Sequence, residues 1–95
     1  MSTTVRQDCV RQRADWMRPV DDQILELMRD EGNLTPLAVE EFGVVENKGY
    51  AGDRFGVLAD YGLVERIARG LYRLTDDGRA YLNEDLDAST LEPDN

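Results

Sequence analysis

The chain of 95 residues has no histidine and a single cysteine, and these absences exclude several kinds of functional site. Without histidine it cannot build a Ser–His–Asp triad or a His-based metal site. Cys9 alone cannot form an intramolecular disulfide or a multi-cysteine metal site. No pairing of nucleophile with base and no glycine-rich phosphate loop is recognisable either. We therefore expect no catalytic residues, no metal and no other cofactor.

Long apolar runs are also missing from the sequence. No run approaches the length of about 18 residues that a membrane span needs, and no signal peptide opens the chain. These features predict a soluble, cytoplasmic protein without a membrane partner. The length suits one small domain with one core.

Lysine is nearly absent, since Lys48 stands against ten arginines. Twelve Asp and eight Glu give a net charge of −9. An acidic, Asp-rich and Lys-poor surface is typical of proteins that work in molar salt, which screens their self-repulsion. The alternative is an acidic protein with no adaptation to salt.

Positive charge is confined to two parts of this acidic chain. Residues 1–18 carry four Arg against two Asp, and residues 47–74 carry five basic against three acidic residues. A polyanionic partner would have to meet these two segments. The alternative is that their arginines are solvated or paired with nearby acids.

Capping residues and apolar spacing predict the order of the elements. Helix starts are indicated by Pro19, by Thr35-Pro36, by Asn47 and by Thr75. The first helix has its apolar residues on one face, at Val20, Ile24, Leu27 and Met28. The second helix is expected to bury Leu37, Ala38 and Phe42. The third is expected to bury Ala51, Phe55 and Leu58. The predicted elements are helices at 19–31, 36–41 and 47–61, strands at 63–67 and 71–74, and a helix from 75 to about 86.

Two helices joined by a tight turn and followed by a hairpin predict a winged helix-turn-helix, a mainly α fold with a small β-hairpin wing. We expect residues 1–18 to form an N-terminal helical extension and residues 19–82 to form the winged-helix DNA-binding domain. Residues 83–95 would be an acidic, partly disordered end.

Two runs of the sequence carry a family resemblance: Gly62-Leu63-Val64-Glu65-Arg66, and the run from Gly70 to Leu82, which reads GLYRLTDDGRAYL. With these runs the sequence resembles the winged-helix repressors of haloarchaea, over residues 14–82. More narrowly, these runs are similar to the group around the halophage phi-H repressor, and at a distance to the MarR and PadR types.

The resemblance implies that the third helix enters the major groove of double-stranded DNA and that the wing lies along the backbone or minor groove. The implied contacts on the third helix are Asn47, Lys48, Tyr50, Asp53 and Arg54, with Arg54 suited to a guanine edge and Lys48 to a phosphate. The implied wing contacts are Arg66, Arg69 and Arg73, of which Arg66 and Arg73 are expected to share the solvent face. Gly49, Gly52 and Gly56 weaken this interpretation, because glycine offers no side chain to read bases.

Proteins of this type usually act as dimers on two half-sites. Val5, Cys9 and Trp16 fall at near-helical spacing, and we expect them to pack at a homodimer interface or on the domain's own core. The sequence thus predicts a dimeric, sequence-specific transcription regulator, most simply a repressor that blocks a promoter. The alternative is a winged-helix module that binds proteins and not DNA.

Overall fold

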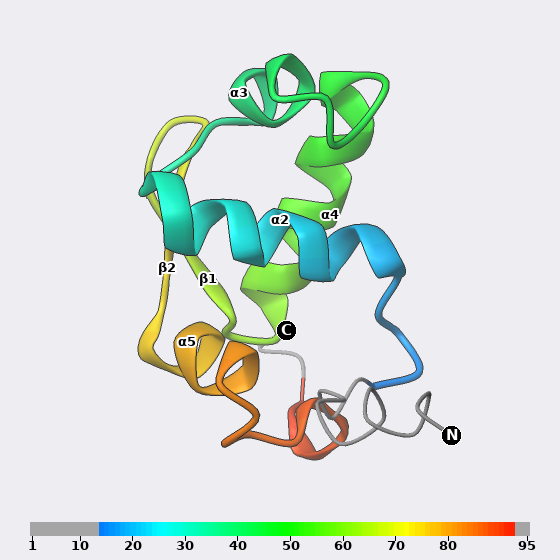
Figure 1. Cartoon of the computed structure of the whole chain (residues 1–95), viewed down its shortest axis with the longest axis vertical. Coiled ribbons are helices and arrows are strands. Elements are labelled where there is room, and N and C mark those ends of the chain that lie inside the picture. Colours follow the sequence, from blue (N-terminus) through cyan, green and yellow to red (C-terminus); the bar gives the residue numbers. More distant parts are fainter. Residues whose placement is uncertain (1–13, 93–95) are drawn as a thin grey trace, which may run out of the picture.

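The computed structural model describes residues 14–92 of the chain. Figure 1 shows helix α2 crossing in front of α4, with α3 and the wing tip at one end of the molecule and α5 at the other. The elements are α2 (Pro19–Glu31), α3 (Pro36–Glu41), α4 (Lys48–Asp60), β1 (Val64–Ala68), β2 (Leu71–Leu74), α5 (Asp76–Leu82) and the 3₁₀ helix η1 (Ala88–Thr90). Their order confirms the predicted winged helix-turn-helix. Within residues 14–92, no helix combines the length and the apolar character that crossing a membrane requires.

Side-chain caps start three of the helices where the sequence predicted them. The Thr35 hydroxyl accepts a hydrogen bond from the backbone N–H of Ala38 at 3.0 Å. The Asn47 amide oxygen accepts from Tyr50 N–H at 2.8 Å. Each bond satisfies a backbone donor that the first turn of a helix leaves unpaired.

The core lies between α2, α4 and the wing. Ile24 and Leu25 of α2 belong to the same hydrophobic core as the predicted inward face of α4, where Ala51, Phe55 and Leu58 are completely buried. The rings of Phe55 and of Tyr72, in β2, stack with their centroids 4.5 Å apart. Aromatic stacking adds to the apolar burial that holds the wing against α4.

Two of the three residues predicted for the core face of the second helix are wrong, whereas the third, Ala38, is partly buried and packs against the core. Leu37 is 47 % exposed and Phe42 is 52 % exposed, whereas Val39 is completely buried. The helix has only six residues, so it presents a single short face to α4, and Val39 occupies that face.

The wing is a two-stranded antiparallel sheet, extended by a bridge from the segment between α2 and α3. Leu34 and Tyr72 exchange two backbone hydrogen bonds of 3.0 Å. The register places Glu65 opposite Arg73 and Arg66 opposite Tyr72. Neighbouring register positions face opposite sides of a sheet, so Arg66 and Arg73 do not share a face. The prediction that they share the solvent face is therefore wrong, because Arg73 pairs with Glu65 and not with Arg66.

The two sequence runs that carry the family resemblance pack against each other. The Thr75 hydroxyl lies 2.7 Å from the carbonyl oxygen of Gly62, to which it donates, and it accepts from the backbone N–H of Gly78 at 3.0 Å. Gly62 ends α4 with a φ of +83°, a conformation that favours glycine. Gly78 is buried, and its backbone meets the carbonyl of Leu63 closely enough to leave no room for a Cβ.

Both ends of the described range differ from expectation. Residues 14–18 form a turn and not a helix, in which Met17 N–H donates to the Ala14 carbonyl at 3.1 Å. The last predicted helix ends at Leu82 and not near Leu86. The segment after it is ordered as far as η1, where Ala88 is completely buried.

Substituting Gly78 by Ala should destabilise the fold, because the added methyl would overlap the Leu63 carbonyl and lie 2.6 Å from Leu74 Cδ1. We expect a loss of about 1–3 kcal/mol in the free energy of unfolding, measured by urea titration in molar KCl. The matched control is Gly56→Ala, since the added methyl there meets no atom within 4 Å. That variant should gain up to about 1 kcal/mol from helix propensity. Equal effects at the two positions would contradict the close contact at Gly78.

Candidate nucleic-acid interface

The position of α4 is fixed by an ion pair that reaches across the core to the start of α2. Arg54 donates from Nε to Asp21 Oδ1 at 2.8 Å and from a terminal nitrogen to Asp21 Oδ2 at 2.6 Å. The same terminal nitrogen lies 3.2 Å from the carbonyl oxygen of Trp16. The Asp21 side chain has no exposed surface, and that of Arg54 is 12 % exposed. The pair is therefore held in a nearly dry environment with two parallel hydrogen bonds.

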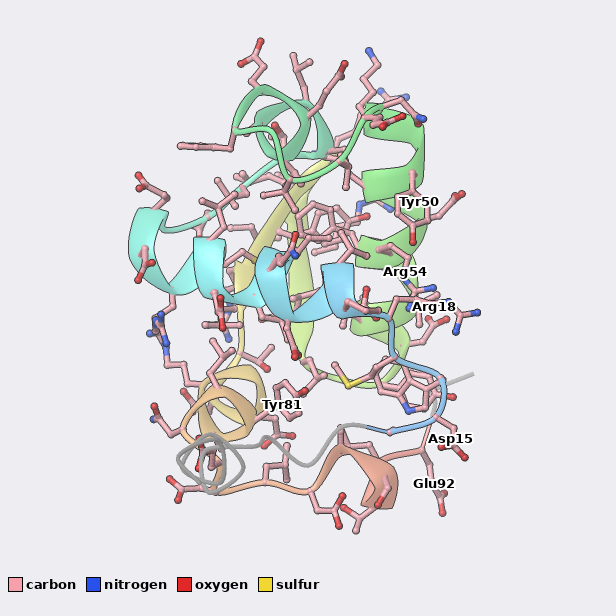
Figure 2. The ribbon with its side chains drawn as sticks, turned by 45° about the vertical axis from the view of Figure 1, so that its right-hand side comes forward. Asp15, Arg18, Tyr50, Arg54, Tyr81 and Glu92 are labelled. Carbon is pink, nitrogen blue, oxygen red and sulfur yellow. The ribbon has the colours of Figure 1, made fainter. Side chains whose placement is uncertain are left out.

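The ion pair also ties the turn before α2 to α4. The backbone N–H of Arg18 donates to Asp21 Oδ2 at 2.9 Å, so the carboxylate accepts from two different segments. The hydrogen-bonded carboxylate raises the pKa of Arg54 above its ordinary value, which keeps the guanidinium charged. Figure 2 shows Arg54 on α4 beside the segment that leads into α2.

Arg54 was predicted as a groove contact that binds a guanine edge. The structure places its guanidinium against Asp21 and Trp16 instead, so Nε and one terminal nitrogen already have acceptors inside the molecule. Breaking such a pair to reach a base would leave the buried Asp21 carboxylate uncompensated. Arg54 is thus placed to position the helix.

A second buried hydrogen bond links α2 to α5. The phenol of Tyr81 donates to Asp22 Oδ1 at 2.7 Å, and Figure 2 shows Tyr81 between the two helices. The two adjacent carboxylates at the start of α2 therefore fix one helix each, with Asp21 holding α4 and Asp22 holding α5.

The outward face of α4 carries no arginine. Its buried positions are Ala51, Phe55 and Leu58, and helical spacing puts Gly49, Asp53 and Gly56 on the opposite side. Lys48, the first residue of the helix, is exposed, and it has no ion-pair partner within the described part of the chain. A positive charge is therefore available at the start of α4 but not along its middle.

Asn47 and Tyr50 stand at the beginning of α4. Asn47 is exposed, and its amide oxygen caps the helix. Tyr50 is 41 % exposed and lines an open hollow of about 480 Å³ between α2 and the turn that precedes α4. Its ring therefore lies toward α2, to one side of the outward face of α4.

The glycines of α4 are not explained by packing inside the molecule. A Cβ added at Gly56 would meet nothing within 4 Å, and one at Gly52 would make an ordinary contact of 3.8 Å with Pro36. At Gly49 it would lie 3.2 Å from the Asn47 amide oxygen, a local crowding with the cap. The glycines leave this side of the helix open to close approach from outside.

The wing offers two arginines whose side chains are not engaged within residues 14–92. Arg69 is exposed at the turn between the strands, and Arg66 is exposed on β1. Arg73 differs, because its Nε donates to the Glu65 carboxylate at 2.6 Å on the surface. Arg66 and Arg69 are therefore the available cations of the wing.

The predicted dimerisation residues are placed only in part. Val5 and Cys9 lie outside the described residues. Trp16 stacks on Tyr61 of the α4 end, with the ring centroids 3.8 Å apart and the planes 12° from parallel. Its indole N–H is buried and has no acceptor among the residues described. In the same range, no group of three or more metal-ligating side chains comes together.

A family model described as winged helix-turn-helix phage repressor matches residues 10–94. The repressor protein of the Halobacterium phage phiH is 34 % identical over 90 residues, which cover 87 % of this chain and 98 % of that protein. The crystal structure of the PhiH1 repressor-like protein from Haloarcula marismortui is 36 % identical and superposes with a TM-score of 0.83, covering 88 % of this chain and 97 % of that one.

Asp21→Asn should destabilise the protein strongly, because it leaves Arg54 charged against a neutral amide. We expect a loss of about 3 kcal/mol in the free energy of unfolding, measured by urea titration. The matched control is Glu65→Gln, which makes the same chemical change in the exposed pair with Arg73 and should cost less than about 1 kcal/mol. If the two variants lost equal stability, the buried pair would not be what holds α4 in place.

Proposed function

Because the chain belongs to the winged helix-turn-helix phage repressor family, we propose that it is a sequence-specific repressor that binds double-stranded DNA as a homodimer. Membership makes the protein a DNA-binding regulator and not an enzyme. Beyond family membership, we propose that the protein is a dimer, that it recognises a specific DNA sequence and that residues of the wing and of α4 contact DNA.

The observation that carries the proposal is the placement of the available cations. Arg69 lies at the wing tip and Lys48 at the first turn of α4, and Figure 1 shows the wing tip and the start of α4 at the same end of the molecule. The protein is otherwise strongly acidic, with a net charge of −9. Lys48 and Arg69, which have no ion-pair partner within residues 14–92, thus stand at the end of the molecule that carries the wing tip and the start of α4, where they suit the phosphates of a duplex.

In this proposal the wing holds the DNA and α4 reads it. Arg66 and Arg69 bind backbone phosphates, and Arg73 contributes less because Glu65 already neutralises it. Asn47, Lys48, Tyr50 and Asp53 approach the groove from the first two turns of α4, the part of a recognition helix that contacts base edges. Repression follows sterically, since a bound repressor blocks access to a promoter.

A dimer would place two copies of α4 on two half-sites. We place its interface near the start of the chain, at Val5 and Cys9, because Trp16 packs on Tyr61 and the core of its own chain. Light scattering in molar KCl should give a mass of twice the 10.8 kDa of one chain. A single-chain mass at the concentrations used for DNA binding would contradict the dimer.

The organisms of the two relatives, a Halobacterium phage and Haloarcula marismortui, agree with a protein that works in concentrated salt. The acidic surface has the same implication. At molar salt, phosphate contacts gain little from the release of counterions. Specific binding there would depend more on shape, on apolar contact and on hydrogen bonds to bases.

A second candidate function is a winged-helix module that binds a protein. The outward face of α4, which carries Asp53 and no arginine, favours it, as do the exposed side chains of Leu37 and Phe42 on α3. Binding of labelled duplex distinguishes the two functions, because the protein-binding module would show no preference for the upstream region of its own gene over scrambled DNA.

Replacing Arg66 and Arg69 by Ala should weaken binding to every duplex by a similar factor. Each lost phosphate contact should reduce the slope of log K against log [KCl] by about 1, so the double variant should lose about 2. Fluorescence anisotropy over a series of KCl concentrations measures that slope. The control is Arg79→Ala, which removes an exposed arginine from α5, at the opposite end of the molecule from the wing tip.

An unchanged slope in the double variant would remove the wing from the interface. No preference for the native duplex in wild-type protein that is folded by circular dichroism would contradict the repressor itself and favour the protein-binding module.

A further inference from the structure

Asp53 lies on the outward face of α4, which also carries Asp60 at the end of the helix. Of the four neighbours of Asp53 on the helix surface, Gly49 and Gly56 lack side chains, whereas Tyr50 and Val57 lie on its other flank. The packing of the molecule leaves Gly56 open, since a Cβ there would contact nothing within 4 Å. On the flank of the two glycines, no neighbouring side chain holds the helix away from a groove that the short Asp53 side chain could enter.

Both carboxylate oxygens of Asp53 are available to a ligand. The residue is exposed and makes no hydrogen bond or ion pair within residues 14–92. Arg54, the adjacent cation, is engaged by Asp21 through two hydrogen bonds. Arg54 therefore makes no ion pair with Asp53. Its hydrogen bond to Asp21 is the largest of the influences that raise the pKa of Arg54, and the charge of Asp53 is the smallest.

We infer that Asp53 is a specificity-determining residue that accepts a hydrogen bond from the 4-amino group of a cytosine in the major groove. This inference rests on the proposed binding of DNA through α4. A carboxylate only accepts hydrogen bonds, so the O6 and N7 of guanine and the O4 of thymine repel it. The adenine amino group lies between two acceptors, its own N7 and the O4 of the paired thymine, whereas the cytosine amino group has one acceptor beside it, the O6 of the paired guanine.

The electrostatic cost of placing a carboxylate near DNA falls at the molar salt concentration in which we propose that the protein works. Phosphates repel Asp53 at low ionic strength, but the screening length is only about 3 Å in 1 M salt. A hydrogen bond made at contact distance on the floor of the groove is screened far less than repulsion from more distant phosphates. Asp53 thus gives discrimination among bases at little cost in affinity under these conditions.

Selection of binding sites from a random duplex library in molar KCl tests the inference. The wild-type protein should enrich a motif with one C·G pair in each half-site whose replacement by A·T lowers affinity about tenfold. Asp53→Asn should enrich the same motif with adenine at that position, because an amide pairs with the N6 and N7 of adenine. Asp53→Ala should lose the preference at that position and keep it elsewhere.

The control variant is Glu46→Gln, which removes a carboxylate just before α4. It should keep the wild-type motif, which separates recognition of a base from a general effect of charge. Urea titration should show that all variants remain folded, because Asp53 and Glu46 are both exposed. If Asp53→Asn enriches the unchanged wild-type motif, the inference is overturned while sequence-specific binding stands. If the wild-type protein enriches no motif, both the proposed function and the inference fail.

Discussion

The hydrogen-bonded ion pair between Arg54 and Asp21 is the interaction on which the interface depends. It joins the middle of α4 to the buried start of α2 and, through the Trp16 carbonyl, to the turn before it. The pair is almost fully withdrawn from solvent, so salt screens it far less than an exposed pair. A protein suited to concentrated salt gains from this arrangement, because the orientation of its α4 does not rely on surface charge.

Because of this pair, fewer cations are available to a polyanion than the sequence suggests. Residues 47–74 carry five basic residues, but Arg54 serves the interior and Arg73 is neutralised by Glu65. Lys48, Arg66 and Arg69 remain. Charge counted along the sequence therefore overstates what a polyanion would meet, and the remaining cations lie at the two elements that the family resemblance assigns to DNA.

Local signals predicted the elements well, because caps and glycine stops act within a few residues of where they occur. Thr35, Asn47 and Thr75 cap the helices that they were expected to cap. Pairing across the chain was not predictable in the same way. Asp21 and Asp22 stand at the start of a helix, where the helix dipole favours an acid whether it is buried or exposed. Nothing in the spacing of the sequence indicates that Arg54 and Tyr81 fold back onto them.

The wing shows a related limit of prediction from sequence. Its register decides which arginines share a face, and the sequence does not predict the bulge near Ile67 that shifts the register. A shift of one residue moves a side chain to the other side of the sheet.

The proposed interface divides affinity for DNA and discrimination among bases between two elements, the wing and α4. The wing holds Arg66 and Arg69, which are unpaired within residues 14–92 and whose phosphate contacts contribute less as salt rises. The outward face of α4 holds short polar and glycine residues, whose contacts depend on direction and fit. A repressor in molar salt keeps its selectivity only through the second kind of contact, so the glycines that weaken α4 as a helix are consistent with reading bases at close range.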